Sequence, residues 1–205
     1  MSKLISMNLL LMMFIGIISI NKADFDVPKF AAKHIVILED ENGSGTGFYV
    51  MFKGKSYLVS NKHVCKDVDG LDNGEGFQKV IALSTEHDLC LLQSNRKQGL
   101  DLSKTDLKVL DKVHVVGYPL GNPVTAREGR YVTHFSQSFP WISQYPVDVM
   151  HVSVTAFGGS SGSPILDDNG QVVGVLFATD ERTYEDSLGV PKDALIKFLN
   201  THIHK

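Results

Sequence analysis

The sequence of 205 residues has only two cysteines, Cys65 and Cys90, which excludes a disulfide-rich scaffold and a zinc site with four cysteine ligands. It has no run of five lysines or arginines, and its net charge is −3, so a nucleic-acid-binding surface is not expected. It also lacks internal repeats and low-complexity stretches. The apolar fraction of 43% and the charged fraction of 21% indicate a chain that folds around a core. Its 18 glycines and 7 prolines indicate many turns, which favours an all-β chain over a helical bundle.

The N-terminal segment differs in composition from the rest of the chain. Lys3 precedes an uncharged apolar run, Leu9–Ile20, of 12 residues. This run is short for a membrane span, which takes about 20 residues, and it fits the apolar region of a secretory signal. We therefore interpret residues 1–23 as a signal peptide cleaved after Ala23, although Asn21 departs from the small-residue rule at its position. An uncleaved membrane anchor and a buried N-terminal helix are the alternatives.

Cleavage after Ala23 would leave residues 24–205, with 18 basic residues, 23 acidic residues and a net charge of −5. This mature chain would be secreted or periplasmic, and whether residues 24–33 form a removable pro-segment stays open. In an oxidising compartment Cys65 and Cys90 could pair, and closing that loop of about 25 residues would contribute roughly 3 kcal/mol of stability. Two small buried thiols are an equal alternative.

Short segments rich in β-branched and aromatic residues recur through the rest of the chain at intervals of roughly ten residues. Without repeated strand–helix alternation, they predict a barrel or sandwich and not a doubly wound parallel sheet. Only Pro191–Asn200 is clearly predicted to be a helix, because proline is favoured at the first helical position and apolar residues follow it. The polar, glycine-rich segment Asp67–Gly76 is predicted to be a loop. The expected strands are His34–Leu38, Thr46–Phe52, Ser56–Ser60, Lys79–Leu83, Leu89–Gln93, Lys112–Gly117, Arg130–Phe135, Val147–Val154, Ser163–Leu166 and Gln171–Phe177.

Three stretches carry residues suited to catalysis. His63 directly follows a predicted strand, where an imidazole can act as a general base. Asp88 opens an apolar run, and a carboxylate there can hold an imidazole through its Nδ1–H. Glycines surround Ser161 in Phe157–Ser163, which lets backbone N–H groups turn inward to form an oxyanion hole. Taken singly, each has an ordinary alternative: a surface histidine, a strand-capping acid and a Gly/Ser surface loop.

In the order His63, Asp88, Ser161, these stretches resemble the trypsin-like serine proteases. Three motifs carry the likeness: Ser60–Val64 for Ala/Thr-x-x-His, Asp88–Leu92 for Asp-Ile/Leu-Ala-Leu-Leu, and Gly159–Pro164 for Gly-Asp/Asn-Ser-Gly-Gly/Ser-Pro. Gly43–Phe48 and Val115–Pro119 also fit the family. The resemblance extends from about Lys33 to Leu199 and is closest to the compact bacterial and viral branch, which includes the high-temperature-requirement protease domain. We expect no PDZ-like extension after it.

This resemblance implies a fold of two six-stranded antiparallel β-barrels, chymotrypsin-like, with a C-terminal helix. The first barrel would span about residues 30–97, the second about 106–190 and the helix about 191–200, with a boundary in the polar stretch Asn95–Thr105. It also implies a serine endopeptidase that acts through an acyl-enzyme intermediate. Ser161 would be the nucleophile, His63 the base and then acid, and Asp88 the group that orients His63. The N–H groups of Gly159 and Ser161 would form the oxyanion hole.

The sequence departs from the family in three places. Ser160 replaces the aspartate that often precedes the nucleophile, so activation through an ion pair with a new N-terminus is not expected. Thr155 stands at the expected pocket floor, with Leu176, Ala178 and Thr179 at the neighbouring wall. These residues predict a small or medium uncharged side chain at the cleaved position. Cys90 replaces the usual alanine after the catalytic aspartate.

Three other interpretations compete with this one. Gly158–Gly162 matches the Gly-x-Ser-x-Gly elbow of α/β-hydrolases with Ser160 as nucleophile, but a turn follows it where that fold needs a helix. A catalytically silent pseudoprotease, used as a binding module, would keep all three residue types. His202 and His204 form a pair that could bind a metal, although a loose C-terminus explains them better. Gly43–Gly47 is not a dinucleotide loop, because a strand follows it.

The expected partners are protein or peptide substrates. Neither a cofactor nor a metal is implied, and nucleic acid is not an expected partner. Membrane association is expected only if the N-terminal segment is not cleaved. The oligomeric state is not predicted.

Overall fold

The computed structural model describes residues 25–41, 43–180, 182 and 185–203. The signal-peptide prediction for residues 1–23 therefore lies outside the described residues. Over the described ranges, no helix is long and apolar enough to cross a membrane.

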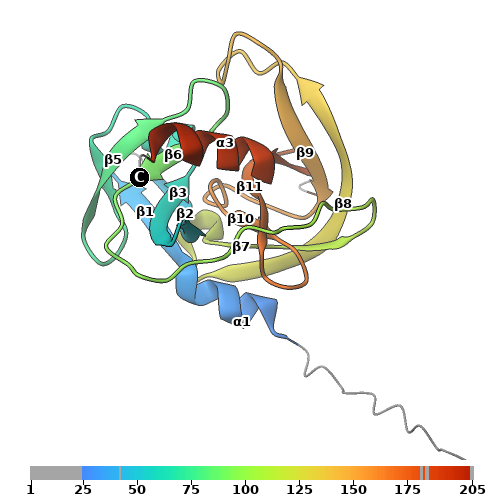
Figure 1. Cartoon of the computed structure of the whole chain (residues 1–205), viewed down its shortest axis with the longest axis horizontal. Coiled ribbons are helices and arrows are strands. Elements are labelled where there is room, and N and C mark those ends of the chain that lie inside the picture. Colours follow the sequence, from blue (N-terminus) through green and yellow to red (C-terminus); the bar gives the residue numbers. More distant parts are fainter. Residues whose placement is uncertain (1–24, 42, 181, 183–184, 204–205) are drawn as a thin grey trace, which may run out of the picture.

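Two closed antiparallel β-barrels of six strands each make up the fold and lie side by side (Figure 1). The all-β prediction of a chymotrypsin-like pair of barrels with a C-terminal helix is confirmed. The first barrel consists of β1 (Ile35–Asp40), β2 (Gly43–Phe52), β3 (Lys55–Ser60), β4 (Gly70–Asp72), β5 (Phe77–Leu83) and β6 (Cys90–Leu92). The second consists of β7 (Lys112–Gly117), β8 (Thr125–Gln137), β9 (Val147–Ser153), β10 (Pro164–Leu166), β11 (Val172–Thr179) and β12 (Ser187–Pro191). The helices are α1 (Val27–Ala31), α2 (Lys62–Cys65) and α3 (Lys192–His202), and η1 (Ala32–His34) and η2 (Pro119–Gly121) are 3₁₀ turns.

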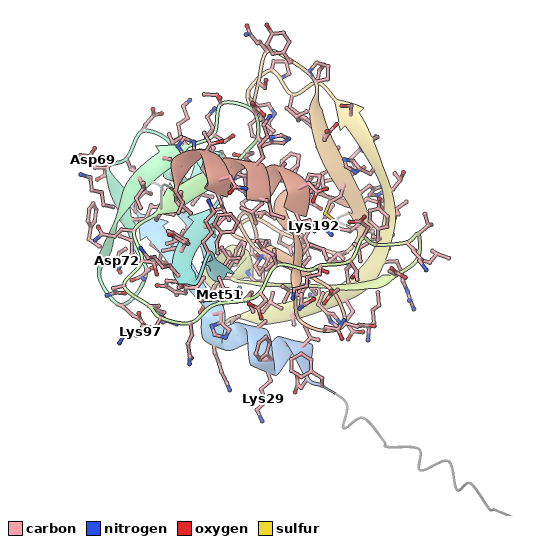
Figure 2. All side chains as sticks on the ribbon, in the orientation of Figure 1. Lys29, Met51, Asp69, Asp72, Lys97 and Lys192 are labelled. Atoms are coloured by element: carbon pink, nitrogen blue, oxygen red, sulfur yellow. A yellow bond between two sulfur atoms is a disulfide. The ribbon has the colours of Figure 1, made fainter. Side chains whose placement is uncertain are left out.

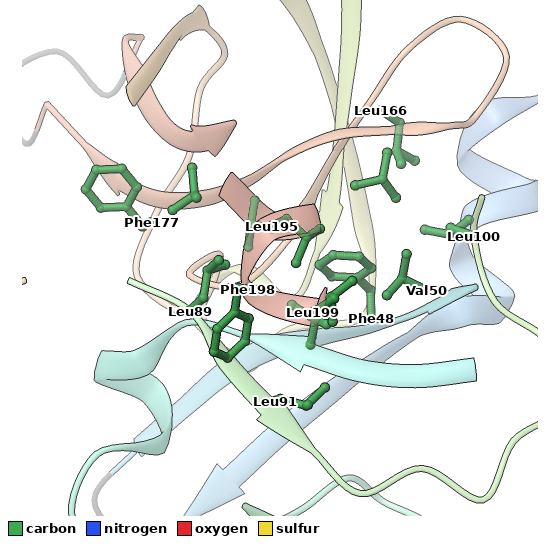
Figure 3. Close-up of a cluster of buried hydrophobic side chains, with 14 of the residues drawn as sticks. Phe48, Val50, Leu89, Leu91, Leu100, Leu166, Phe177, Leu195, Phe198 and Leu199 are labelled. Atoms are coloured by element: carbon green, nitrogen blue, oxygen red, sulfur yellow. The ribbon is translucent and has the colours of Figure 1, made fainter. Parts of the chain in front are cut away.

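One hydrophobic cluster joins the two barrels and α3 (Figure 3). Phe48 and Leu91 contribute from the first barrel, Leu166 from the second and Phe198 from α3, and none of these side chains is more than 5% exposed. Because burial of apolar surface drives folding, this shared cluster holds the barrels in one arrangement. The cleft between them can therefore be built from both.

The linker between the barrels pairs with each of them. Leu100 exchanges backbone hydrogen bonds with Tyr49 and Met51 on β2, at 2.7 and 2.8 Å. On its other side, the linker pairs with Val172 at the start of β11. Lys192, which Figure 2 labels in the first turn of α3, also contacts the linker. Its Nζ donates to Thr105 O at 2.6 Å. Both barrels are thus tied to the segment that connects them.

The structure corrects four details of the sequence-based prediction. The loop expected at Asp67–Gly76 contains the short strand β4, in which Leu71 is buried despite its polar neighbours. The strand β12 was not predicted, because a glycine and a proline interrupt its short sequence, and it forms through pairing with β9 and β11. The short helices α1 and α2 were also not predicted. In α1, Val27 and Ala31 are buried, so residues just before the first barrel belong to the folded core.

Candidate active site

His63 lies in α2, the single helical turn that follows β3. Asn61, just before α2, is buried, and its Nδ2 donates to Asp88 O at 2.8 Å. This bond ties the turn carrying His63 to the segment carrying Asp88. The His63 side chain remains 37% exposed, so one edge of its ring is accessible to a substrate.

Asp88 holds His63 with both carboxylate oxygens. Its Oδ1 accepts the His63 backbone N–H at 2.9 Å, and its Oδ2 lies 2.6 Å from His63 Nδ1. The Asp88 side chain is only 1% exposed, so water does not compete for these contacts. A carboxylate at Nδ1 sets the ring orientation and leaves Nε2 free to accept a proton.

A disulfide joins the same two segments. Cys65, the last residue of α2, is bonded to Cys90, the first residue of β6. Both cysteines are fully buried. The bond therefore links the chain two residues beyond His63 to the chain two residues beyond Asp88.

Ser161 lies in a loop built from consecutive tight turns between β9 and β10. The Ser160 N–H donates to Phe157 O and the Ser163 N–H to Ser160 O, each at 3.0 Å. Gly159 takes a φ of +85°, which favours glycine at that position in the turn. The loop leaves Ser161 half-buried at the surface of the second barrel.

His63, Gly159 and Ser161 line one pocket of about 300 Å³. Within the described part of the chain, neither the Gly159 nor the Ser161 backbone N–H has a hydrogen-bond acceptor. No hydrogen bond joins Ser161 Oγ to His63 among those residues. Such contacts are often long before substrate binds. The pocket therefore brings an imidazole, a hydroxyl and two free amides together.

The expected substrate-pocket residues lie at neighbouring points of the second barrel. Thr155, Ala178 and Thr179 are half-buried, whereas Leu176 is 2% exposed and packs in the core of that barrel. The buried hydroxyl of Ser187 donates to Val154 O at 2.8 Å and lies 3.3 Å from Thr179 Oγ1. Ser187 therefore links the segment carrying Thr155 to the segment carrying Thr179.

Two residues that contact this site were not predicted from the sequence. Trp141, on the loop between β8 and β9, packs edge-on against His63 with ring centroids 6.0 Å apart. It also contacts Phe139 and Phe177, yet it stays 55% exposed. No local pattern around this single tryptophan indicates such a contact. Thr46 contacts the Ser161 loop from the first barrel, and the family-like stretch Gly43–Phe48 was the only sequence signal for it.

The structure bears on two of the competing interpretations, the α/β-hydrolase elbow and the metal site. Ser160 is 6% exposed and is followed by β10 instead of a helix, so the α/β-hydrolase interpretation is wrong. Among the described residues, no group of three or more His, Cys, Asp or Glu side chains could hold a metal ion. His204 lies outside those residues, and the His202 ring packs on Phe198.

Comparison with known proteins identifies the family. A family model described as a trypsin-like peptidase domain matches residues 45–175, more than half of the chain. The chain belongs to the trypsin-like peptidase family. This trypsin-like peptidase is 27% identical over 157 residues to the serine protease Do-like HtrA of Bacillus subtilis, covering 67% of this chain and 34% of that protein. It is also 27% identical over 141 residues to the uncharacterised protein y4bJ of Sinorhizobium fredii, covering 66% of this chain and 22% of that protein.

The match thus spans about a third or less of the length of these curated relatives. Among solved structures, the active form of the Rv3671c protease of Mycobacterium tuberculosis superposes with a TM-score of 0.75 at 23% identity. That alignment covers 88% of this peptidase and 85% of the other chain. HtrA-type proteases superpose as well, AlgW among them with a TM-score of 0.71 at 19% identity. At such identities, these structures support the fold alone.

Proposed function

We propose that this protein is a serine endopeptidase that hydrolyses peptide bonds with His63, Asp88 and Ser161 as catalytic residues. One observation carries the proposal: the buried Asp88 holds His63 with both oxygens beside a pocket lined by Gly159 and Ser161, whose N–H groups have no acceptor among the described residues. These groups supply a nucleophile, an oriented base and donors for a developing oxyanion.

The reaction would proceed in two halves. In the first, Ser161 Oγ attacks the carbonyl carbon while His63 Nε2 takes the hydroxyl proton, and the N–H groups of Gly159 and Ser161 donate to the oxyanion. The C–N bond then breaks, His63 returns the proton to the leaving amine, and an ester to Ser161 remains. In the second half, water attacks this ester as His63 takes its proton. The C–O bond to Ser161 breaks, the acid product leaves, and the proton returns to Ser161 Oγ.

For specificity, we propose that Thr155, Ala178 and Thr179 line the pocket for the side chain at the cleaved position, and that Leu176, which packs in the core of the second barrel, supports that wall from within. The hydrogen bonds of Ser187 support this assignment, because they place the Thr155 and Thr179 segments next to each other. None of the four residues carries a charge. Peptides with a small or medium uncharged residue should therefore be cleaved faster than peptides with lysine or arginine. A library varied at that position measures this, and preference for a basic residue would contradict it.

The proposed setting is secretory or periplasmic, with residues 1–23 as the signal peptide. The first described helix supports a cut before residue 25, because Asp26 caps α1 and Val27 is already buried. N-terminal sequencing of the exported protein tests this. A mature N-terminus inside α1 would contradict it.

The deciding experiment is labelling of the purified mature protein with a fluorophosphonate, followed by peptide mapping. The reagent needs an activated serine and an oxyanion hole but no knowledge of the substrate. Label on Ser161 that disappears in Ser161→Ala would support the proposal. Absence of label on folded protein would contradict it and favour the pseudoprotease.

A further inference from the structure

Thr46 links the first barrel to the loop that carries Ser161. It lies on β2 with none of its surface exposed. Its N–H donates to Ser161 O at 2.8 Å, and its Oγ1 donates to Gly159 O at 2.8 Å. The same Oγ1 accepts the Tyr118 N–H at 3.0 Å, while Thr46 O accepts Ser60 Oγ at 2.7 Å. Every polar atom of this buried residue is thus paired, three of its four contacts reaching the second barrel.

A second contact fixes the neighbouring peptide. The Leu120 N–H, in the 3₁₀ turn after β7, donates to Gly158 O at 2.6 Å. In a trans peptide the C=O and N–H point in opposite directions, so this bond holds the Gly159 N–H away from Leu120. Leu120 itself adopts a φ of +56°, a conformation that leucine rarely takes. The Gly159 N–H is one of the two site amides that have no acceptor in the part of the chain that the structure describes.

The packing leaves this arrangement little freedom. A Cβ added to Gly159 would lie 2.5 Å from Tyr118 O and 2.9 Å from Leu120 N. A Cβ added to Gly117 would lie 2.8 Å from Thr46 Oγ1. The Thr46 hydroxyl therefore occupies a space that exists only because residue 117 is glycine, at the point where β2, the Tyr118 turn and the Ser161 loop meet.

We propose that Thr46 is a positioning residue for the oxyanion hole. Its hydroxyl holds the Gly159–Ser160 peptide through Gly159 O and the Tyr118 turn through the Tyr118 N–H. Because that turn in turn bonds Gly158 O through the Leu120 N–H, Thr46 constrains the Gly158–Gly159 peptide from both sides and keeps its N–H in the orientation that donates. The inference rests on the proposed function and deepens it. Thr46 touches no reacting atom in this scheme, because it acts through the loop. Removing the Thr46 hydroxyl should make the orientation of the Gly159 N–H, one of the two proposed oxyanion donors, less fixed.

The test compares Thr46→Val with Thr46→Ser. Valine has the same shape but no hydroxyl, whereas serine keeps the hydroxyl and both hydrogen bonds. Loss of one oxyanion donor typically lowers kcat by about 10²–10³-fold, so loosening one should lower kcat by roughly 10–100-fold in Thr46→Val, with KM nearly unchanged. Thr46→Ser should stay near the wild-type kcat. Thermal unfolding verifies that each variant is folded at the assay temperature.

A transition-state analogue separates positioning from a general structural effect. A peptide aldehyde forms a hemiacetal whose oxygen needs the oxyanion donors, so its inhibition constant should rise in proportion to the fall in kcat/KM. Binding of a non-covalent product peptide should not change. If Thr46→Val does not fold, Thr46→Ala decides, because the smaller side chain leaves room for water around Gly159 O and should show the same pattern more weakly.

Wild-type kcat and aldehyde affinity in a folded Thr46→Val or Thr46→Ala would overturn the inference, and so would an effect on KM alone. These outcomes differ from failure of the proposed function. In that case the wild-type protein would itself show neither fluorophosphonate label on Ser161 nor turnover.

Discussion

Cys65 and Cys90 are joined by a disulfide that connects the chain just beyond His63 to the chain just beyond Asp88. The covalent link and the two Asp88 contacts therefore constrain the same pair of segments. Because the cysteines are 25 positions apart, the bond also restricts the unfolded chain.

Replacing both cysteines, Cys65→Ala with Cys90→Ala, should lower the free energy of unfolding by roughly 3 kcal/mol, mainly by freeing a loop of this length in the unfolded state. Alanine suits these buried sites because it leaves no unpaired polar atom. Urea unfolding measures the change, and wild-type protein treated with reductant should shift in the same direction. An unchanged midpoint would mean that the disulfide does not stabilise the fold.

Asp88→Asn should lower kcat by about 10⁴-fold, because an amide cannot provide the charge that stabilises the imidazolium and can hold the wrong tautomer. Ser161→Ala and His63→Ala should each abolish turnover, and all three variants should unfold cooperatively like the wild type. Steady-state kinetics on a common peptide provide the comparison. Near-normal activity of Asp88→Asn would mean that the Asp88 carboxylate is not needed to orient His63.

Gly159→Ala should abolish activity, whereas Gly158→Ala should be tolerated. A Cβ at residue 159 would meet Tyr118 O at 2.5 Å on a backbone with a φ of +85°, while a Cβ at residue 158 meets nothing closer than Leu120 at 4.0 Å. The two adjacent glycines form a matched pair within one turn. Fluorophosphonate labelling rates report the difference, and equal rates in both variants would show that the turn tolerates a side chain at either position.

Trp141→Ala should weaken cleavage of peptides that carry an apolar residue next to the cleaved position. The indole is 55% exposed beside His63, where it offers an apolar surface to the substrate. Loss of a contact worth about 1–2 kcal/mol corresponds to a decrease in kcat/KM of roughly 5–30-fold. Most of this decrease should come from a higher KM. Tyr145→Ala is the control, because this exposed aromatic on the same loop lines a different pocket. Equal losses in both variants would argue against a specific role for Trp141.

His87 should make the fold less stable as the pH falls. Burial lowers the pKa of His87 from its ordinary value of 6.5, and its Nε2 has no hydrogen-bond partner among the described residues. Below about pH 6.5 the unfolded chain then binds a proton that the folded protein resists, so the stability present above that pH is lost as the pH falls.

Urea unfolding between about pH 7 and pH 5 measures this dependence. In His87→Gln the loss of stability over that range should be smaller than in the wild type. His134→Gln, on the exposed part of β8, controls for the removal of an imidazole. The same pH slope in His87→Gln and the wild type would refute the assignment to His87.

Much of the fold was predictable because its strands are encoded locally. Lys112–Gly117 was predicted with the observed bounds of β7, and β2, β3 and β11 differ by a few residues at their ends. The strands β4 and β12 were not, because β4 is only the three residues Gly-Leu-Asp and the five residues of β12 include a glycine and a proline. They exist through hydrogen bonds to neighbouring strands that a local pattern does not contain.

The candidate site, like the fold, was predictable only in part from the sequence. The sequence by itself determined the residue types and their order, His63, Asp88 and Ser161, because a histidine after a strand, an acid before an apolar run and glycines around a serine are local signals. Their catalytic roles stay predictions. Only the tertiary structure decided that Thr46 bonds to Gly159, 113 positions away, and that Trp141 covers one side of His63. Such contacts depend on how two barrels dock, and docking is set by the shared core and not by any one segment.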